Sequence, residues 1–136
     1  MTDLTEVARR TCRLLVTGRS DELSALVQAG CRVTVPTGDS VPIEDFDELH
    51  HALRLAFPDL RWEIVQMVAS GDTVVVELSM RGTNTGRFPV GACELEPTGA
   101  TITLHTCEML RIVAGKVVEW RTWLDARTML FQLASD

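Results

Sequence analysis

The segment 101–125 carries an alternating apolar pattern that constrains the fold more than any other part of the chain. In its first half, the even-numbered residues are apolar apart from Thr106 and Glu108. Alternation of this kind is typical of a β-strand with one face in the core. Ala114-Gly115 then marks a tight turn before a second strand. That strand places these residues on its apolar face: Val118, Trp120, Thr122 and Leu124. The segment therefore predicts an antiparallel hairpin with one buried face.

Glu108 is a carboxyl on this predicted apolar face, where the hydroxyl of Thr122 and the indole of Trp120 accompany it. A buried ionised carboxylate is costly, so it either has a partner or has its pKa raised toward neutrality. A group with such a pKa can exchange protons, so we select Glu108 as a candidate catalytic residue. The alternative is structural, because Glu108 could accept hydrogen bonds from Thr106, Arg111 or a helix residue and fix the core.

The length and charge of the chain limit its class. A chain of 136 residues matches one domain with one core, and we expect a single domain over residues 1–136. With 13 Lys and Arg against 19 Asp and Glu, the formal net charge is -6. Phosphate backbones and anionic membranes would be repelled by this charge. We therefore expect no direct binding to nucleic acid or to membranes.

Residues for metal, redox and phenol chemistry are few. The 4 cysteines form no CxxC pair and the 3 histidines add no metal-ligand spacing, so we expect reduced thiols and no metal. Tyrosine is absent, which excludes a phenol as proton donor. The first residues are acidic and polar, unlike a signal peptide, and no apolar run approaches the roughly 18 residues of a membrane span. We expect a cytoplasmic protein.

Helical spacing in the first half predicts three helices. The first begins after Thr2 or Asp3 and ends at Gly18, and a short second helix opens at Ser20 and closes at Gly30. A brief strand is expected over 31–35 and a loop after it. The third helix is expected over 43–57, and Pro58 ends it. The N-terminal half is therefore mainly helical.

The second half predicts mainly strands. A hairpin is expected from 60–69 and 73–82, and the residues 83–99 predict a loop with one irregular strand near 89–95 that could fold over a pocket. Asp125 can cap a final helix that holds Met129, Leu130 and Leu133. Helices gathered early and strands gathered late predict an α+β fold, with helices on one face of a curved, mainly antiparallel sheet.

Further candidate residues surround the predicted apolar hollow. His50 lies in the apolar stripe of the third helix, and it could hydrogen-bond Glu108 or a ligand, although a histidine satisfied by backbone is the alternative. Thr122 could orient a substrate oxygen. The candidate ligand-binding residues are Thr122, Trp120, Thr106, Trp62, Leu53 and Phe57. For the tryptophans, simple packing in the core is the alternative.

Several stretches resemble the SnoaL-like polyketide cyclases. They lie within roughly residues 43–135 and comprise Met109 to Val118, Trp120 to Asp125, Gln132-Leu133, Ala56 to Leu60, Arg81 to Gly86 and Pro97 to Gly99. The resemblance implies the cone-shaped α+β barrel of the nuclear-transport-factor-2-like superfamily, with N-terminal helices on the concave face of the sheet and one deep apolar cavity. It also implies a homodimer formed by the outer sheet face, where we place Arg121 and Trp123.

The resemblance also gives the expected chemistry. The best-known cyclases of this family close a ring by an intramolecular aldol reaction, without metal or cofactor. Their base is an aspartate where this chain has Thr122, and a histidine stands where it has Glu108. Threonine cannot be the base at ordinary pH. Steroid isomerases of the superfamily place a protonated carboxyl at the position of Glu108, but they also need a tyrosine.

Two functions follow as expectations. The first is a cyclase- or isomerase-type enzyme that needs no cofactor and transfers a proton on a small hydrophobic substrate, polyketide-like or polycyclic, through Glu108 tuned by His50. The alternative is a non-catalytic protein that binds a small hydrophobic ligand and has lost the catalytic base, as Thr122 suggests. A dimeric scaffold with a packed interior is a third possibility. The enzyme requires that Glu108 lie in a dry chamber that still admits a small molecule.

Overall fold

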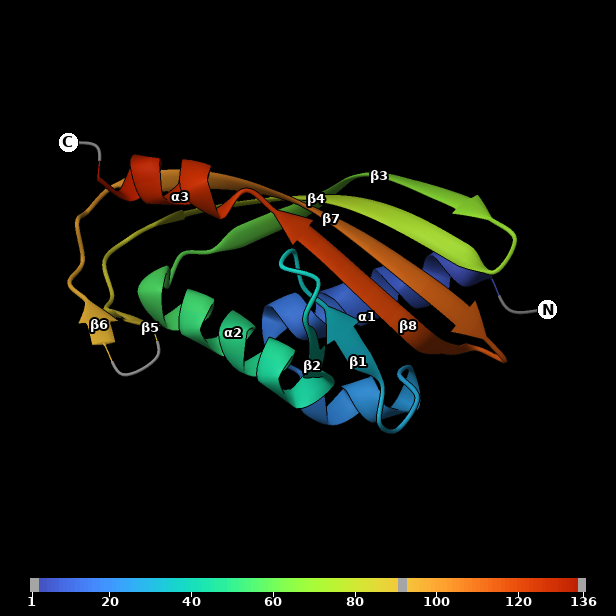
Figure 1. Ribbon diagram of the computed structural model, residues 1–136. Coiled ribbons are helices and arrows are strands. Elements are labelled where there is room, and N and C mark those ends of the chain that lie inside the picture. Colours follow the sequence, from blue (N-terminus) through green and yellow to red (C-terminus); the bar gives the residue numbers. More distant parts are fainter. Residues whose placement is uncertain (1–2, 91–92, 135–136) are drawn as a thin grey trace.

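The computed structural model describes residues 3–90 and 93–134, which form an α+β fold (Figure 1). The helices are α1 (Leu4–Thr17), the 3-10 helix η1 (Ser20–Ala25), α2 (Ile43–Ala56) and α3 (Ala126–Leu133). The strands are β1 (Arg32–Thr34), β2 (Ser40–Pro42), β3 (Arg61–Ser70), β4 (Thr73–Thr83), β5 (Phe88–Val90), β6 (Cys93–Leu95), β7 (Thr101–Val113) and β8 (Lys116–Leu124). The predicted fold class is confirmed.

One curved sheet carries the fold, with strand order β2-β1-β8-β7-β4-β3. Its neighbouring strands are antiparallel except for β1 and β8, which run parallel. Helices α1 and α2 lie side by side along one face of the sheet, as Figure 1 shows. The strands β5 and β6 form a separate small sheet. The predicted arrangement of N-terminal helices on a curved, mainly antiparallel sheet is confirmed. Within the residues described, every helix is too short or too polar to cross a lipid bilayer.

The central hairpin follows the alternating pattern along β7, where the even-numbered side chains are buried. Ala114 and Gly115 turn the chain with φ values of 54° and 79°, as a tight hairpin turn requires. The pattern was wrong at the start of β8, where Val117 is buried and Val118 is only half-buried. A β-bulge causes this change, because the pairing of β7 with β8 shifts its register between Arg111 and Ile112.

The ends of α1 follow their local signals. Asp3 accepts a hydrogen bond from the Thr5 N–H, and Gly18 ends the helix with a left-handed φ of 80°. The second predicted helix was wrong in length and type, because η1 is a 3-10 helix that ends at Ala25. The chain leaves the helix here because Val117 of β8 exchanges backbone hydrogen bonds with the segment that follows, at Leu26 and Gln28. Pairing with the sheet therefore overrides the helical spacing.

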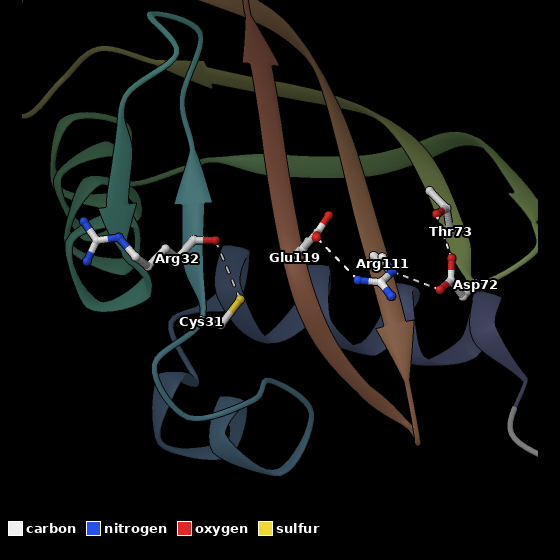
Figure 2. Close-up of polar contacts among 6 residues, drawn as sticks. All are labelled: Cys31, Arg32, Asp72, Thr73, Arg111 and Glu119. Atoms are coloured by element: carbon white, nitrogen blue, oxygen red, sulfur yellow. Dashed lines mark hydrogen bonds and ion pairs between the residues drawn. The ribbon is translucent and has the colours of Figure 1, made fainter.

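The hairpin of β1 and β2 was only half predicted, since the sequence predicts β1 and a loop after it. Arg32 fastens the two strands, because its Nε and Nη2 donate to the side-chain and backbone oxygens of Ser40, each at 2.8 Å. Figure 2 shows Arg32 on this hairpin, beside Cys31, whose thiol lies 3.7 Å from the Arg32 carbonyl oxygen. Strand β2 has three residues and includes a proline, so its local signal is weak.

The segment between β4 and β7 packs over the end of α2. Asn84 is buried and donates to the Ala56 carbonyl oxygen at 3.2 Å, while it accepts a hydrogen bond from the Thr98 N–H at 2.8 Å. Phe88 packs edge-on against Phe57, with ring centroids 6.3 Å apart. Two short strands stand where one irregular strand was predicted, and residues 91–92 of that prediction lie outside the described residues. The segment therefore closes one end of the core.

The buried apolar side chains form two clusters. The first lies between α1, α2 and most of the sheet, and it includes Val76, Leu110 and Trp120. The second lies at the end closed by β5, and its members are Ala52, Leu53, Ala56, Phe57, Phe88, Ile102 and Leu133. Helix α3 contributes Leu133 and lies beside β7, beyond the end of β8. There the side-chain oxygen of Gln132 accepts a hydrogen bond from the Thr103 N–H at 2.7 Å. Leu130, a predicted apolar contact of this helix, is exposed.

Arg111 links two carboxylates at the surface end of the hairpin (Figure 2). Its Nε lies 2.9 Å from Asp72 Oδ2, and its Nη1 lies 3.4 Å from Glu119 Oε1. The guanidinium lowers the pKa of Asp72. All three side chains are exposed, so water and salt screen these pairs.

We expect Arg111→Met to have the same urea unfolding midpoint as wild-type protein, within experimental error. Arg87→Met should behave in the same way, because it removes a comparable exposed ion pair with Glu94. A large loss confined to Arg111→Met would contradict this expectation.

Candidate functional site

Glu108 lies at the middle of β7 on the face that the helices cover. Its side chain is 3% exposed, and its register partners are Val76 on β4 and Thr122 on β8. The carboxylate oxygen Oε2 accepts a hydrogen bond from Trp120 Nε1 at 3.1 Å. Burial raises the pKa of Glu108 to about 7, although the hydrogen bond from Trp120 and the nearby hydroxyls of Thr122 and Thr106 oppose the change. Both protonation states of this acid are therefore accessible near neutral pH.

Two buried hydroxyls flank this carboxyl, one on each strand of the hairpin. Thr106 precedes Glu108 by two residues on β7, and Thr122 lies directly opposite Glu108 on β8. Their exposures are 5% and 2%. Both hydroxyls lie close enough to lower the pKa of Glu108, yet neither Oγ1 has a hydrogen-bond partner of good geometry. Buried hydroxyls are usually paired, so these two are the unusual groups of the site.

Helix α1 covers the acid from the other side of the core. Cys12 is 1% exposed, and its thiol pKa is raised by burial and then by the nearby charge of Glu108. Thr11 uses its own hydroxyl within the helix, where it donates to the Val7 carbonyl oxygen at 2.7 Å. The sequence does not indicate which part of the sheet the thiol of Cys12 would meet. Cys12 is therefore a residue of this site that the sequence analysis missed.

His50 is 6% exposed on α2, where its Nδ1 lies 3.0 Å from the Phe46 carbonyl oxygen. Burial lowers the pKa of His50, so the ring is neutral near pH 7 and carries its proton on Nδ1. Phe46 packs edge-on against both His50, at 4.7 Å between centroids, and Trp120, at 5.4 Å. Within the described residues, His50 is therefore linked to Glu108 through Phe46 and Trp120 rather than by a hydrogen bond.

The remaining predicted site residues lie in different parts of the core. Leu53 and Phe57 belong to the second cluster, whereas Trp120 belongs to the first. Trp62 is half-buried and packs at the edge of the first cluster. Thr106, Glu108 and Thr122 are buried polar residues on the inner face of the sheet, and His50 is a buried polar residue of α2. The structure therefore brings Trp120, Thr106 and Thr122 to Glu108 and places Leu53 and Phe57 together in the second cluster.

Open hollows lie at the surface. One of about 540 Å³ is on the outer sheet face and is lined by Arg61, Trp62, Glu63, Ser79, Arg81 and Thr103. Another of about 530 Å³ lies between η1 and α2, and a third of about 410 Å³ lies at the edge of β1 and β8, where Trp120 forms part of its wall. Glu108, Thr106 and Thr122 line none of these three hollows. The chamber around Glu108 stays a prediction.

The described residues offer no cluster of three or more His, Cys, Asp or Glu side chains that could hold a metal ion. The chemistry that the described side chains themselves offer at this point is that of the Glu108 carboxyl and of its neighbours. A carboxyl with a pKa of about 7 can act as a general acid or as a general base, and two hydroxyls can donate to an oxygen beside it.

One family model matches the chain, and several solved structures share its fold. Residues 5–133 match the model of the SnoaL-like polyketide cyclase family. IdmH from Streptomyces antibioticus, a candidate polyketide cyclase, is 22% identical with a TM-score of 0.82 over 98% of this chain and 100% of its own. AclR from Streptomyces galilaeus, a candidate hydroxylase, is 24% identical with a TM-score of 0.76, over 96% of this chain and 82% of its own.

A candidate SnoaL-like polyketide cyclase from Jannaschia sp. CCS1 is 22% identical, with a TM-score of 0.78 over 97% of this chain and 94% of its own. No curated protein matches the chain. The solved structures therefore share the cone-shaped α+β fold, and the family model covers nearly the whole sequence. The chain belongs to the SnoaL-like polyketide cyclase family.

Proposed function

We propose that the protein is a cyclase- or isomerase-type enzyme that needs no cofactor and transfers a proton on a small hydrophobic substrate, polyketide-like or polycyclic. The observation that carries this proposal is Glu108, a buried acid with a pKa of about 7, beside two buried hydroxyls that have no hydrogen-bond partner of good geometry. A general base or acid works best when its pKa lies near the operating pH. Burial of an acid lowers the stability of the fold, and acids with a shifted pKa are found preferentially at functional sites.

The proposed reaction begins with the ionised form of Glu108. Its carboxylate removes a proton from a carbon next to a substrate carbonyl, and the electron pair moves onto the carbonyl oxygen. The hydroxyls of Thr106 and Thr122 donate to this oxygen as its charge develops, which is worth most in a dry site. The enolate then either attacks a second carbonyl of the same substrate or takes the proton back at another carbon. In both cases Glu108 ends ionised again, once the new alkoxide or carbon has been protonated.

The other predicted residues enter this proposal in secondary roles. His50 tunes the site through the ring contacts of Phe46 with Trp120, because its neutral ring holds Phe46 in place. Leu53 and Phe57 are the proposed contacts for the hydrophobic part of the substrate. Trp62 would contact that part from the edge of the first cluster. IdmH and the Jannaschia protein, both candidate polyketide cyclases, support the substrate class.

Deuterium exchange tests this proposal. Molecules that copurify with the protein from its own host are identified by native mass spectrometry, and polyketide-like ketones of the same class are incubated with the protein in D₂O. Wild-type protein should speed the incorporation of deuterium at the carbon next to the carbonyl. Exchange at the wild-type rate in Glu108→Gln would remove Glu108 from the mechanism.

The second candidate function is binding of a small hydrophobic ligand without catalysis. Two observations favour it, namely the threonine at position 122, where the family resemblance expects a base, and the hydrogen bond that already occupies one oxygen of Glu108. A ligand that copurifies with the protein, binds stoichiometrically and shows no exchange in D₂O would support this function over the enzyme.

We also propose that the protein forms a homodimer through the outer sheet face. Trp123 is 42% exposed there, and Arg121 is exposed beside it without an ion-pair partner among the described residues. Exposed tryptophan and arginine are typical of interfaces.

We expect wild-type protein to sediment as a dimer and Trp123→Asp as a monomer. Leu95→Asp is the matched control, because Leu95 on β6 is also 42% exposed, and it should stay dimeric. A monomeric wild-type protein would end the proposal.

A further inference from the structure

Trp120 holds one particular oxygen of Glu108. Its indole Nε1–H donates to Glu108 Oε2 at 3.1 Å, and 1% of Trp120 and 3% of Glu108 are exposed. An indole N–H can donate a hydrogen bond but cannot accept one. The oxygen Oε2 therefore faces a donor whether the carboxyl is ionised or protonated.

The position of the indole is fixed by both layers of the fold. In the hairpin register, Trp120 on β8 pairs with Leu110 on β7, and Thr122 pairs with Glu108. The indole therefore reaches diagonally from β8 to the Glu108 carboxyl on β7. From the helix layer, the ring of Phe46 meets the indole edge-on at 5.4 Å between centroids. A side chain held from two layers cannot easily turn its N–H away from Glu108.

We propose that Trp120 is a positioning residue, which occupies Oε2 of Glu108 and so leaves Oε1 as the oxygen that gives and takes the proton. In a protonated carboxyl the carbonyl oxygen is a better acceptor than the hydroxyl oxygen, so the Trp120 N–H on Oε2 favours the form that carries its hydrogen on Oε1. When Oε1 gives this proton to a ligand, the Trp120 hydrogen bond stabilises the carboxylate that forms. The proton then returns to the same oxygen. The inference rests on the proposed function only in taking Glu108 as the proton-transfer group.

Among the described residues, the groups around Glu108 provide no positive charge that could take over this role. From α1 the acid faces Cys12, and the next residue on β7 is Cys107; the pKa of each thiol is raised, mainly by burial and further by Glu108. Strand β4 presents Val76, and β8 presents the neutral Thr122. From α2, His50 faces Phe46, and burial lowers its pKa. Burial raises the pKa of Glu108, and the hydrogen bond from Trp120 has the largest effect among the groups that lower it.

A pH titration of the indole N–H signals tests the inference in the wild-type protein. The chain has 3 tryptophans, so ¹⁵N-labelled protein gives three indole signals, which Trp62→Phe and Trp123→Phe assign. The Trp120 signal should move as Glu108 titrates, with a midpoint near its pKa of about 7. The movement should disappear in Glu108→Gln. A Trp120 signal that stays constant across this pH range in wild-type protein would overturn the inference.

The reciprocal experiment follows the Glu108 carboxyl by ¹³C NMR in Trp120→Phe. Loss of a hydrogen bond to the ionised form should lower the acid dissociation constant of Glu108 about tenfold. Trp123→Phe is the control, because Trp123 lies on the outer face and should leave this constant unchanged. An unchanged constant in folded Trp120→Phe would also overturn the inference. If that variant does not fold, the wild-type indole titration decides alone.

The two proposals can fail separately. A constant indole signal together with an inactive Glu108→Gln removes the role of Trp120 and leaves the proposed function. A titrating indole signal together with full deuterium exchange in Glu108→Gln leaves Trp120 bound to Glu108 but removes the acid from catalysis.

Discussion

Glu108→Gln is expected to make the protein more stable above neutral pH while it removes most of the proton-transfer activity. The amide keeps the size of the side chain, and its oxygen can accept the Trp120 N–H as Glu108 Oε2 does. Its NH₂ group can donate to the hydroxyls of Thr106 and Thr122. An amide cannot take up a proton at ordinary pH, so we expect exchange activity to fall at least about 100-fold.

The gain in stability follows from the raised pKa of Glu108. Below pH 4.5, the ordinary value, the acid is protonated in both the folded and the unfolded chain and has no effect. Between 4.5 and about 7 the unfolded chain ionises while the folded protein keeps its proton. The free energy of unfolding therefore falls as pH rises through this window, by about 3 kcal/mol. Above it the loss is complete and constant.

Urea unfolding of wild type and Glu108→Gln across this pH range measures the effect. The variant should gain stability relative to wild type as pH rises, up to about 3 kcal/mol at about pH 8. Glu63→Gln is the control, because Glu63 is exposed on β3, and its difference from wild type should not change with pH in this way. A difference between wild type and Glu108→Gln that does not depend on pH would show that Glu108 is not a buried acid of raised pKa.

Gly86→Ala is expected to be the most damaging substitution outside the site. A Cβ on Gly86 would overlap the backbone carbonyl oxygen of Leu55, at the end of α2. The Gly86 N–H also donates to the Ala56 carbonyl oxygen at 3.2 Å, so the segment cannot move away without breaking this contact. Because the clash is with backbone, we expect a loss of at least about 3 kcal/mol in the free energy of unfolding.

Gly99→Ala separates this steric effect from backbone strain in the same segment. Gly99 has a φ of 76°, yet a Cβ there would meet nothing within 4 Å. Its expected loss is therefore only the cost of a left-handed residue, about 1 kcal/mol. Thermal or urea unfolding of the two variants gives the comparison. Equal losses would show that the segment does not pack on α2 as closely as the structure has it.

The sequence determined the inner face of β7 and the ends of several elements. Alternation along β7 placed Glu108 on the inner face, and Asp3 and Gly18 marked the ends of α1. These features were predictable because they depend on spacing and on groups a few residues apart. The resemblance added the cone-shaped fold, which the solved structures share.

The tertiary structure alone decided which groups meet. The bulge that turns Val117 inward and the early end of η1 arise from strand pairing, which local spacing does not specify. The sequence placed Trp120 on the same face as Glu108, and the register of β7 and β8 together with the packing of Phe46 directs its N–H to Glu108. Spacing along a chain fixes the face on which a side chain lies. Its partner is fixed by residues far away in the sequence, because hydrogen bonds and packing depend on how separate elements are placed together.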